Sequence, residues 1–162
     1  MTEAKIVLVR HGETVWNTER KWQGHKNSPL TQNGIDQARA VAQRLKEMSF
    51  TTLYSSPLGR AMQTAEIISE ATHHEIIKVS GITERSTGVF EGLSIDEIQT
   101  TYPDELQDFE NSGPDYAPPG GESARQHEQR VMQSLNELTA RHPNEQVLVV
   151  THGGVLNRLL RN

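Results

Sequence analysis

The chain has 162 residues, a formal net charge of −5 and no cysteine. Its length fits one globular domain over residues 1–162, and its negative charge argues against nucleic acid and anionic membranes as partners, because both require a positive surface. The lack of cysteine excludes disulfides, thiolate metal sites and thiol catalysis.

Four short apolar runs are typical of strands. The first, KIVLV at residues 5–9, is rich in β-branched residues, which predicts a strand buried on both faces. Its apolar part is too short for a signal peptide or a membrane span, so we expect a soluble, cytoplasmic protein. QVLVV at residues 146–150 repeats the pattern, and residues 52–55 and 75–79 are weaker strand candidates.

Helical patterns separate these runs. Thr31 can cap a helix whose apolar face continues to Met48, and Pro57 suits the first turn of a second helix. The longest pattern covers residues 122–142, and a short one covers residues 155–160. Parallel strands need crossover connections, so this alternation predicts a three-layer α/β/α sandwich with a mostly parallel central sheet.

The segment from residue 94 to residue 121 interrupts this alternation. It has short helical patterns at residues 95–101 and 104–110, followed by a loop rich in glycine and proline. Insertions of this kind often overhang a binding site. We therefore expect residues 94–121 to form a lid.

Two of the apolar runs end alike, in VLVRHGET with Arg10 and His11, and in LVVTHGG with His152. Ligands of parallel sheets gather at the carboxyl ends of the strands. A single histidine at a strand end is more often a structural residue than a catalyst. Two histidines in matching His-Gly contexts reverse that expectation and predict that both belong to one site.

Six blocks in order carry a family resemblance: LVRHGETVWN, WQGHKNSPLTQNG, YSSPLGRAMQTAEII, a glutamate before GVFEG, PPGGES and VTHGG. Together they cover the chain from Lys5 to Leu160. The sequence resembles the histidine phosphatase superfamily, in its phosphoglycerate mutase-like branch and the phosphatase-like part of that branch. The resemblance implies a phosphoglycerate mutase-like fold.

The resemblance also implies roles for individual residues. His11 would attack phosphorus and become phosphorylated, and Glu84 would protonate the leaving group and later act as base on water. The residues implied to bind the phosphate are Arg10, Asn17, Gln23, Gly24, Arg60 and His152. Thr18 and Thr151 are, like Gly24, weaker candidates, and Glu91 competes with Glu84 as the acid.

Some of these residues can also be interpreted without the family. Arg10 would be a charge at the end of a buried strand, which must be paired or bind something. Arg60 alone would be taken for an exposed residue on a helix surface, and Glu84 for a solvated loop residue. The remaining histidines lack a spaced second ligand, so we expect no metal site, and the resemblance implies no cofactor.

Three functions stay open. The resemblance implies a phosphoric monoester hydrolase of the histidine acid phosphatase type, a bisphosphoglycerate-dependent phosphoglycerate mutase, or a module that binds a phosphorylated ligand without turnover. Mutases of the family carry basic groups on the insertion, whereas residues 95–116 here hold seven acidic residues and no lysine or arginine. Hydrolysis of a small phosphorylated metabolite is therefore the favoured prediction.

The chain ends ten residues after His152, whereas the resemblance implies a further helix or strand in that region. An apolar face left uncovered there would favour a homodimer.

Overall fold

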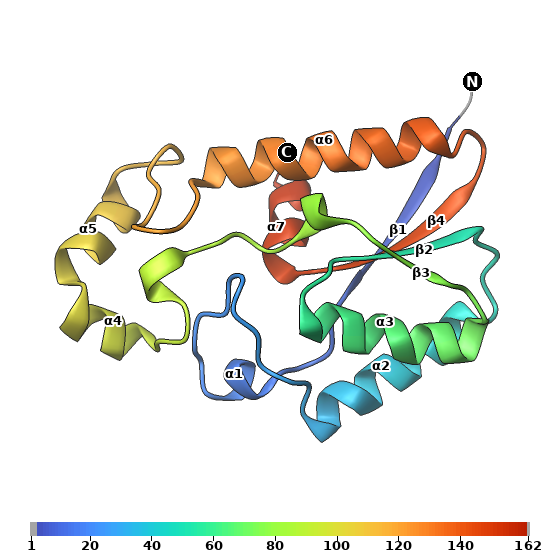
Figure 1. Ribbon diagram of the computed structural model, residues 1–162, viewed down its shortest axis with the longest axis horizontal. Coiled ribbons are helices and arrows are strands. Elements are labelled where there is room, and N and C mark those ends of the chain that lie inside the picture. Colours follow the sequence, from blue (N-terminus) through green and yellow to red (C-terminus); the bar gives the residue numbers. More distant parts are fainter. Residues whose placement is uncertain (1–2, 162) are drawn as a thin grey trace.

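The computed structural model describes residues 3–161, which contain one four-stranded parallel sheet (Figure 1). Its strands are β1 (Lys5–Arg10), β2 (Thr52–Ser55), β3 (Ile76–Lys78) and β4 (Gln146–Thr151), in the spatial order β1-β4-β2-β3. Each strand lies where an apolar run predicts it, and all three pairings are parallel. The parallel sheet of the predicted α/β fold is confirmed.

β1 lies at the edge of this sheet, and the prediction that it is buried on both faces holds only in part, because Val7 packs against one core and Ile6 and Leu8 pack against the other while remaining partly exposed. Within residues 3–161 it pairs only with β4, and Val9 is its only buried residue. β4 pairs on both sides and is buried from Val147 to Thr151. The runs KIVLV and QVLVV are nearly alike, and their burial differs because the sheet order gives them different neighbours.

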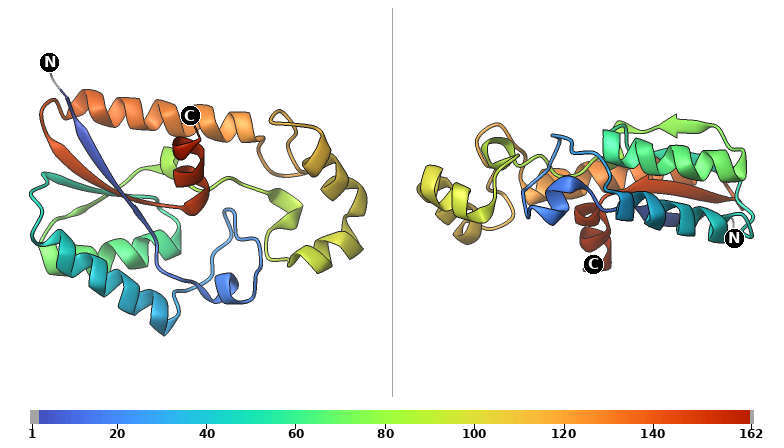
Figure 2. Two further views of the ribbon diagram at one scale, coloured as in Figure 1. Left: turned by 180° about the vertical axis from the view of Figure 1, so that it is seen from behind. Right: turned by 90° about the horizontal axis from the view of Figure 1, so that it is seen from below.

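Helices cover both faces of the sheet (Figures 1 and 2). On one face, Leu148 and Val150 of β4 join a core with α2 (Gln32–Leu45) and α3 (Gly59–Thr72). On the other face, Val147 and Val149 join a core with α6 (Ala124–Arg141) and α7 (Gly153–Leu160). Successive strand residues point to opposite faces, so one apolar strand supplies both cores, and the three-layer sandwich is confirmed.

The helix ends follow local chemistry. The Thr31 hydroxyl accepts a hydrogen bond from the Gly34 N–H at 3.0 Å, as expected for the cap of α2. Ser123 caps α6 through a capping box with Gln126. The expectation for Pro57 is wrong, because α3 begins only at Gly59.

The insertion folds as an appendage with its own small core. It contains α4 (Ile95–Thr101) and α5 (Pro103–Asn111), and Figure 2 shows both helices beyond one end of the sheet. Ile98 and Leu106 pack with Phe90 there, and Trp22 and Phe109 surround them. The short elements are α1 (Val15–Thr18), η1 (Ser80–Ile82) and η2 (Gly88–Phe90). No helix within residues 3–161 has the length and apolar character needed to cross a membrane.

The core assignment predicts how two substitutions differ. Leu148 in the central strand is 0% exposed, so Leu148→Ala should lower the free energy of unfolding by about 2–5 kcal/mol. Ile77 on β3 is 46% exposed, so Ile77→Ala should lower it by less than about 1 kcal/mol. Urea denaturation followed by circular dichroism measures both values, and equal losses would contradict the assignment.

Candidate active site

The two histidines meet at the carboxyl ends of β1 and β4. These strands pair so that Arg10 lies opposite Thr151, and the His11 N–H donates to the Thr151 carbonyl oxygen at 3.1 Å. The two imidazoles follow directly, with ring centroids 5.3 Å apart and planes at 61°. Both are buried, His11 to 7% and His152 to 0% exposure. The register of one strand pair therefore brings the two side chains together.

The His11 ring is held in one tautomer. Its Nδ1 lies 2.7 Å from the carbonyl oxygen of Gly12, which can only accept, so Nδ1 carries the proton and Nε2 is left with its lone pair. Gly12 allows this close turn, because a Cβ there would lie 2.3 Å from the Gly34 carbonyl oxygen.

The protonation state of His11 follows from its surroundings. Burial lowers the pKa of His11 to about 4 against the opposing effect of the Gly12 hydrogen bond, and the positive charges of Arg60 and Arg10 lower it further. The imidazole is therefore neutral near pH 7, which is the form that can act as a nucleophile.

His152 is the N-cap residue of α7 and carries a free ring nitrogen. Its Nε2 lies 2.7 Å from the Ser56 hydroxyl oxygen, whereas its buried Nδ1 has no hydrogen-bond partner in the part of the chain that the structure describes. Burial, followed by the positive charge of Arg60, holds the pKa of His152 well below its ordinary value. A neutral ring with one unpaired nitrogen can bond to a further polar group.

Arg60 is almost completely buried, at 1% exposure, although the sequence taken without the family resemblance suggests a surface residue. Its Nη1 donates to the Lys26 carbonyl oxygen at 2.8 Å and its Nη2 to the Gly24 carbonyl oxygen at 2.7 Å. Its Nε is buried without a partner among residues 3–161. Burial lowers the pKa of Arg60 to about 10 despite the charges of Glu84 and Glu91, so the guanidinium remains a cation near pH 7.

A cavity of about 560 Å³ lies in front of these groups. The sequence-predicted site residues that line it are Arg10, His11, Asn17, Gln23, Gly24, Arg60 and Glu84. A second cavity of about 590 Å³, beside α2, shares Arg10, His11 and Asn17 with it but reaches neither Arg60 nor Glu84. His152 lines neither cavity. The first cavity therefore brings together the other predicted phosphate ligands with His11 and Glu84.

Arg10 differs from the expectation in one respect. The argument that it must be paired assumed a buried strand end, yet Arg10 is exposed. Its guanidinium lies against Gly153, where a Cβ would be 3.2 Å from the Arg10 Nε, and no hydrogen bond or ion pair of this side chain is found within residues 3–161. It is a solvated cation that can bind an anion in the cavity.

The two candidate carboxylates have different surroundings. Glu84 lines the cavity, and its carboxylate accepts from the Gly154 N–H at 2.9 Å and from the Arg85 N–H at 2.8 Å. Glu91 does not line it and is 7% exposed. Its oxygens accept from the backbone N–H groups of His25, Lys26 and Thr87 and from the Ser86 hydroxyl. Glu91 thus ties two loops together, and Glu84 is the carboxylate that faces the cavity.

The remaining polar candidates divide into two groups. Asn17 and Gln23 line the cavity, and the amide oxygen of each lies within hydrogen-bond distance of the Thr14 hydroxyl, at 3.1 and 3.0 Å. Thr18 and Thr151 do not line it. Thr18 bonds to the Val15 carbonyl oxygen, and Thr151 donates to the Ile82 carbonyl oxygen at 2.7 Å.

Sequence reasoning missed several residues of the cavity. The wall also includes Lys21, Trp22, Arg85, Thr87, Phe109, Leu156, Asn157 and Leu160. Trp22 directly precedes the predicted site residue Gln23, and Arg85 directly follows Glu84. This adjacency in sequence was the available signal for both. Among residues 3–161 no group of three or more histidines and carboxylates gathers as a metal site.

Comparison with known proteins agrees with this geometry. The family model described as histidine phosphatase superfamily (branch 1) matches residues 6–162. The chain is 42% identical to the metal-independent phosphoserine phosphatase and 40% identical to phosphoglycerate mutase-like protein 4, both of Arabidopsis thaliana. Each alignment covers 96% of this chain, which spans 66% and 69% of the length of these relatives.

The fold has equally close counterparts. The solved structure of Bacillus stearothermophilus YhfR is 37% identical and superposes with a TM-score of 0.88, over 97% of this chain and 78% of that one. The resemblance seen in the motifs is therefore confirmed along nearly the whole chain. On this agreement of sequence, fold and histidine placement, the chain belongs to branch 1 of the histidine phosphatase superfamily.

Proposed function

We propose that the chain is a phosphatase that hydrolyses small-molecule phosphomonoesters through a phosphohistidine on His11. The observation that carries this proposal is the state of the His11 ring. Its Nδ1 is occupied by the Gly12 carbonyl oxygen, its pKa is about 4, and cationic groups surround it. A neutral imidazole with one available nitrogen, in a cavity that Arg10 and Arg60 also line, suits nucleophilic attack on phosphorus.

In the first step, the Nε2 lone pair of His11 forms a bond to phosphorus while the bond from phosphorus to the ester oxygen breaks. Glu84 in its acid form gives a proton to the departing oxygen. The alcohol leaves, and the phosphoryl group stays on His11.

Charge develops on the phosphoryl oxygens during this step, and catalysis consists mainly of stabilising it. Arg10 and Arg60 supply permanently charged planar donors. If the Ser56 hydroxyl donates to Nε2 of His152, Nδ1 of that ring carries the hydrogen and donates to a phosphoryl oxygen. Asn17 and Gln23 add neutral polar contacts at the cavity wall.

In the second step, Glu84 removes a proton from a water molecule that attacks phosphorus. The bond between phosphorus and Nε2 breaks, inorganic phosphate leaves, and the neutral His11 ring returns with Glu84 protonated for the next turnover.

The existing contacts of Lys21 and Arg85, two further cations of the cavity wall, favour hydrolysis over mutase activity. Lys21 is 3.0 Å from Glu19, and Arg85 donates to the carbonyl oxygens of Glu122 and Tyr116. Both are therefore already engaged, and residues 95–116 contribute only acidic groups as charges. A relative named as a phosphoserine phosphatase points the same way. The proposal places the enzyme in the cytoplasm as a single domain, acting on a small phosphorylated metabolite.

Phosphate labelling tests the nucleophile. Wild-type protein incubated with a ³²P-labelled phosphomonoester and quenched in alkali should carry label that acid removes, and His11→Ala should carry none. His11→Ala should also lose more than a thousandfold in kcat/KM, which corresponds to more than about 4 kcal/mol of barrier. His73→Asn, at an exposed helix end with φ of 62°, is the matched control. A wild type without label would favour a binding module that does not turn over.

A chelator and a second substrate test the reaction type. Because the proposed steps use a histidine and no Lewis acid, p-nitrophenyl phosphate hydrolysis should keep its rate within about twofold after EDTA treatment. The same preparation should not interconvert 2- and 3-phosphoglycerate in a coupled assay. Loss of turnover with EDTA would contradict the mechanism, and rapid interconversion would identify a mutase.

The neutral state of His11 predicts a pH dependence of stability. With a pKa of about 4 in the fold against 6.5 for the model value, the folded protein binds fewer protons than the unfolded chain between these values. Stability from this residue is complete above about pH 6.5 and is lost as the pH falls toward 4. His11→Gln should reduce the loss of unfolding free energy between pH 7 and pH 5 by about 2 kcal/mol. Urea titrations at both pH values measure this, and equal losses would refute it.

A further inference from the structure

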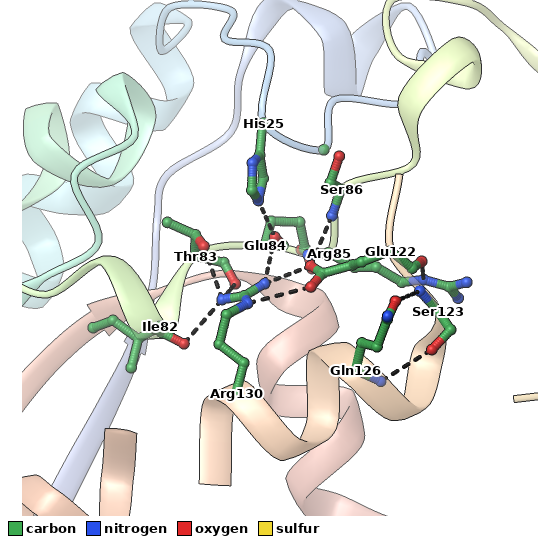
Figure 3. A network of polar contacts seen from close by, with 12 residues as sticks. His25, Ile82, Thr83, Glu84, Arg85, Ser86, Glu122, Ser123, Gln126 and Arg130 are labelled. Atoms are coloured by element: carbon green, nitrogen blue, oxygen red, sulfur yellow. Dashed lines mark hydrogen bonds and ion pairs between the residues drawn. The ribbon is translucent and has the colours of Figure 1, made fainter. Parts of the chain in front are cut away.

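The backbone that carries Glu84 is held by one side chain of α6. Figure 3 shows Arg130 reaching from α6 to this loop. Its Nη1 donates to the carbonyl oxygens of Gly81 and Thr83 at 2.9 and 3.2 Å, and to the Thr83 hydroxyl at 2.8 Å. Its Nη2 donates to the carbonyl oxygen of Glu84 at 3.3 Å. A single guanidinium thus fixes the chain up to and including Glu84.

Glu122 connects Arg130 to the backbone that follows Glu84. Its carboxylate accepts from Nε of Arg130 at 3.3 Å and from Nη2, and also from the Ser86 N–H at 3.0 Å. Burial tends to raise the pKa of Glu122, but the hydrogen bonds from Arg130 and Ser86 hold it below the ordinary value. Glu122 therefore remains a carboxylate that joins Arg130 to the chain that follows Glu84.

Two further contacts complete the network. Nε of Arg85 donates to the Glu122 carbonyl oxygen at 3.0 Å, and Nε2 of His25 lies 2.8 Å from the Glu84 carbonyl oxygen (Figure 3). The carbonyl oxygen of Glu84 is thus bound by both Arg130 and His25. The Glu84 carboxylate, within the part of the chain that the structure describes, accepts hydrogen bonds from the backbone N–H groups of Arg85 and Gly154. The position of the carboxyl therefore depends on the backbone of residues 83–86.

We propose that Arg130, held by Glu122, is a positioning residue that fixes the backbone of Glu84 and so aims its carboxyl at the leaving-group oxygen. This inference rests on the proposed phosphatase function. Proton transfer requires heavy atoms about 2.6–3.2 Å apart, so a small shift of this backbone weakens the acid without changing the groups that bind phosphate. Neither Arg130 nor Glu122 lines the cavity itself.

Leaving groups distinguish this role from a merely structural one. An alkoxide leaves only with a proton, whereas 2,4-dinitrophenolate leaves without one. Loss of folded protein lowers the rates on both esters by the same factor, because both are measured on one preparation. Misplacement of Glu84 slows phosphoryl transfer to His11 from the alkyl ester only, whereas the later attack of water, in which Glu84 is the base, is common to both esters. We therefore compare kcat/KM values, which report on the steps up to release of the alcohol, and their ratio reports on the acid alone.

The experiment compares β-glycerophosphate with 2,4-dinitrophenyl phosphate. Arg130→Lys keeps the charge but loses the planar fork, and its kcat/KM on β-glycerophosphate should fall at least about tenfold more than its kcat/KM on the activated ester, within the range of general acid catalysis. Glu122→Gln keeps an oxygen for the Ser86 N–H and should shift the ratio in the same direction, by about threefold or more. If Arg130→Lys fails to fold, Glu122→Gln decides the matter.

Two further variants serve as controls, one with no expected effect and one with the largest expected effect. Arg125→Lys on the same helix breaks an exposed ion pair with Asp115 and should leave the ratio unchanged. Glu84→Gln should show the largest selective loss. If Glu84→Gln is selective but Arg130→Lys and Glu122→Gln are not, the positioning role is overturned and the phosphatase proposal stands. If Glu84→Gln lowers kcat/KM on both esters equally, the role of Glu84 as acid is overturned and this inference with it.

Discussion

The site depends on the parallel pairing of β1 with β4 in one register. Arg10 lies opposite Thr151, so the strands end at the same level and His11 and His152 leave them side by side, 5.3 Å apart between ring centroids. A slip of one residue would turn one of these side chains to the other face of the sheet. Alternate residues of β4 fill two different cores, so the packing of both cores fixes this register. The packing therefore also keeps the two histidine side chains next to each other.

Much of this arrangement could be predicted because it depends on patterns within short segments of the sequence. The four strands, the Thr31 cap and the two histidine-bearing strand ends are local patterns, and the six family blocks gave the site residues in chain order. Burial was predicted less well, since it depends on neighbours distant in sequence. β1 lies at the sheet edge, which its composition cannot reveal. Arg60 is buried because the carbonyl groups of Gly24 and Lys26, more than thirty residues away, cover it.

Glu91 shows why such distant contacts matter for the site. It binds the backbone N–H groups of His25 and Lys26 on one loop and that of Thr87 on the other. The first loop supplies the carbonyl groups that hold Arg60, and the second follows Glu84 directly. A Cβ at Gly24 would lie 2.1 Å from the Glu91 carboxylate, so the two loops are in close contact. Arg60, the proposed phosphate-binding cation, and Glu84, the proposed proton donor, are thereby held by two loops that are tied to each other.

The appendage of α4 and α5 stands apart from this frame. Its small core of Phe90, Ile98 and Leu106 is separate from the two cores of the sheet, and Phe109 is its only residue on the cavity wall within the described chain. Substitutions in these helices can therefore accumulate without disturbing the histidines or the arginines. Under the proposed function, this separation would allow sequence changes in the appendage to alter substrate preference while the proposed catalytic residues stay unchanged.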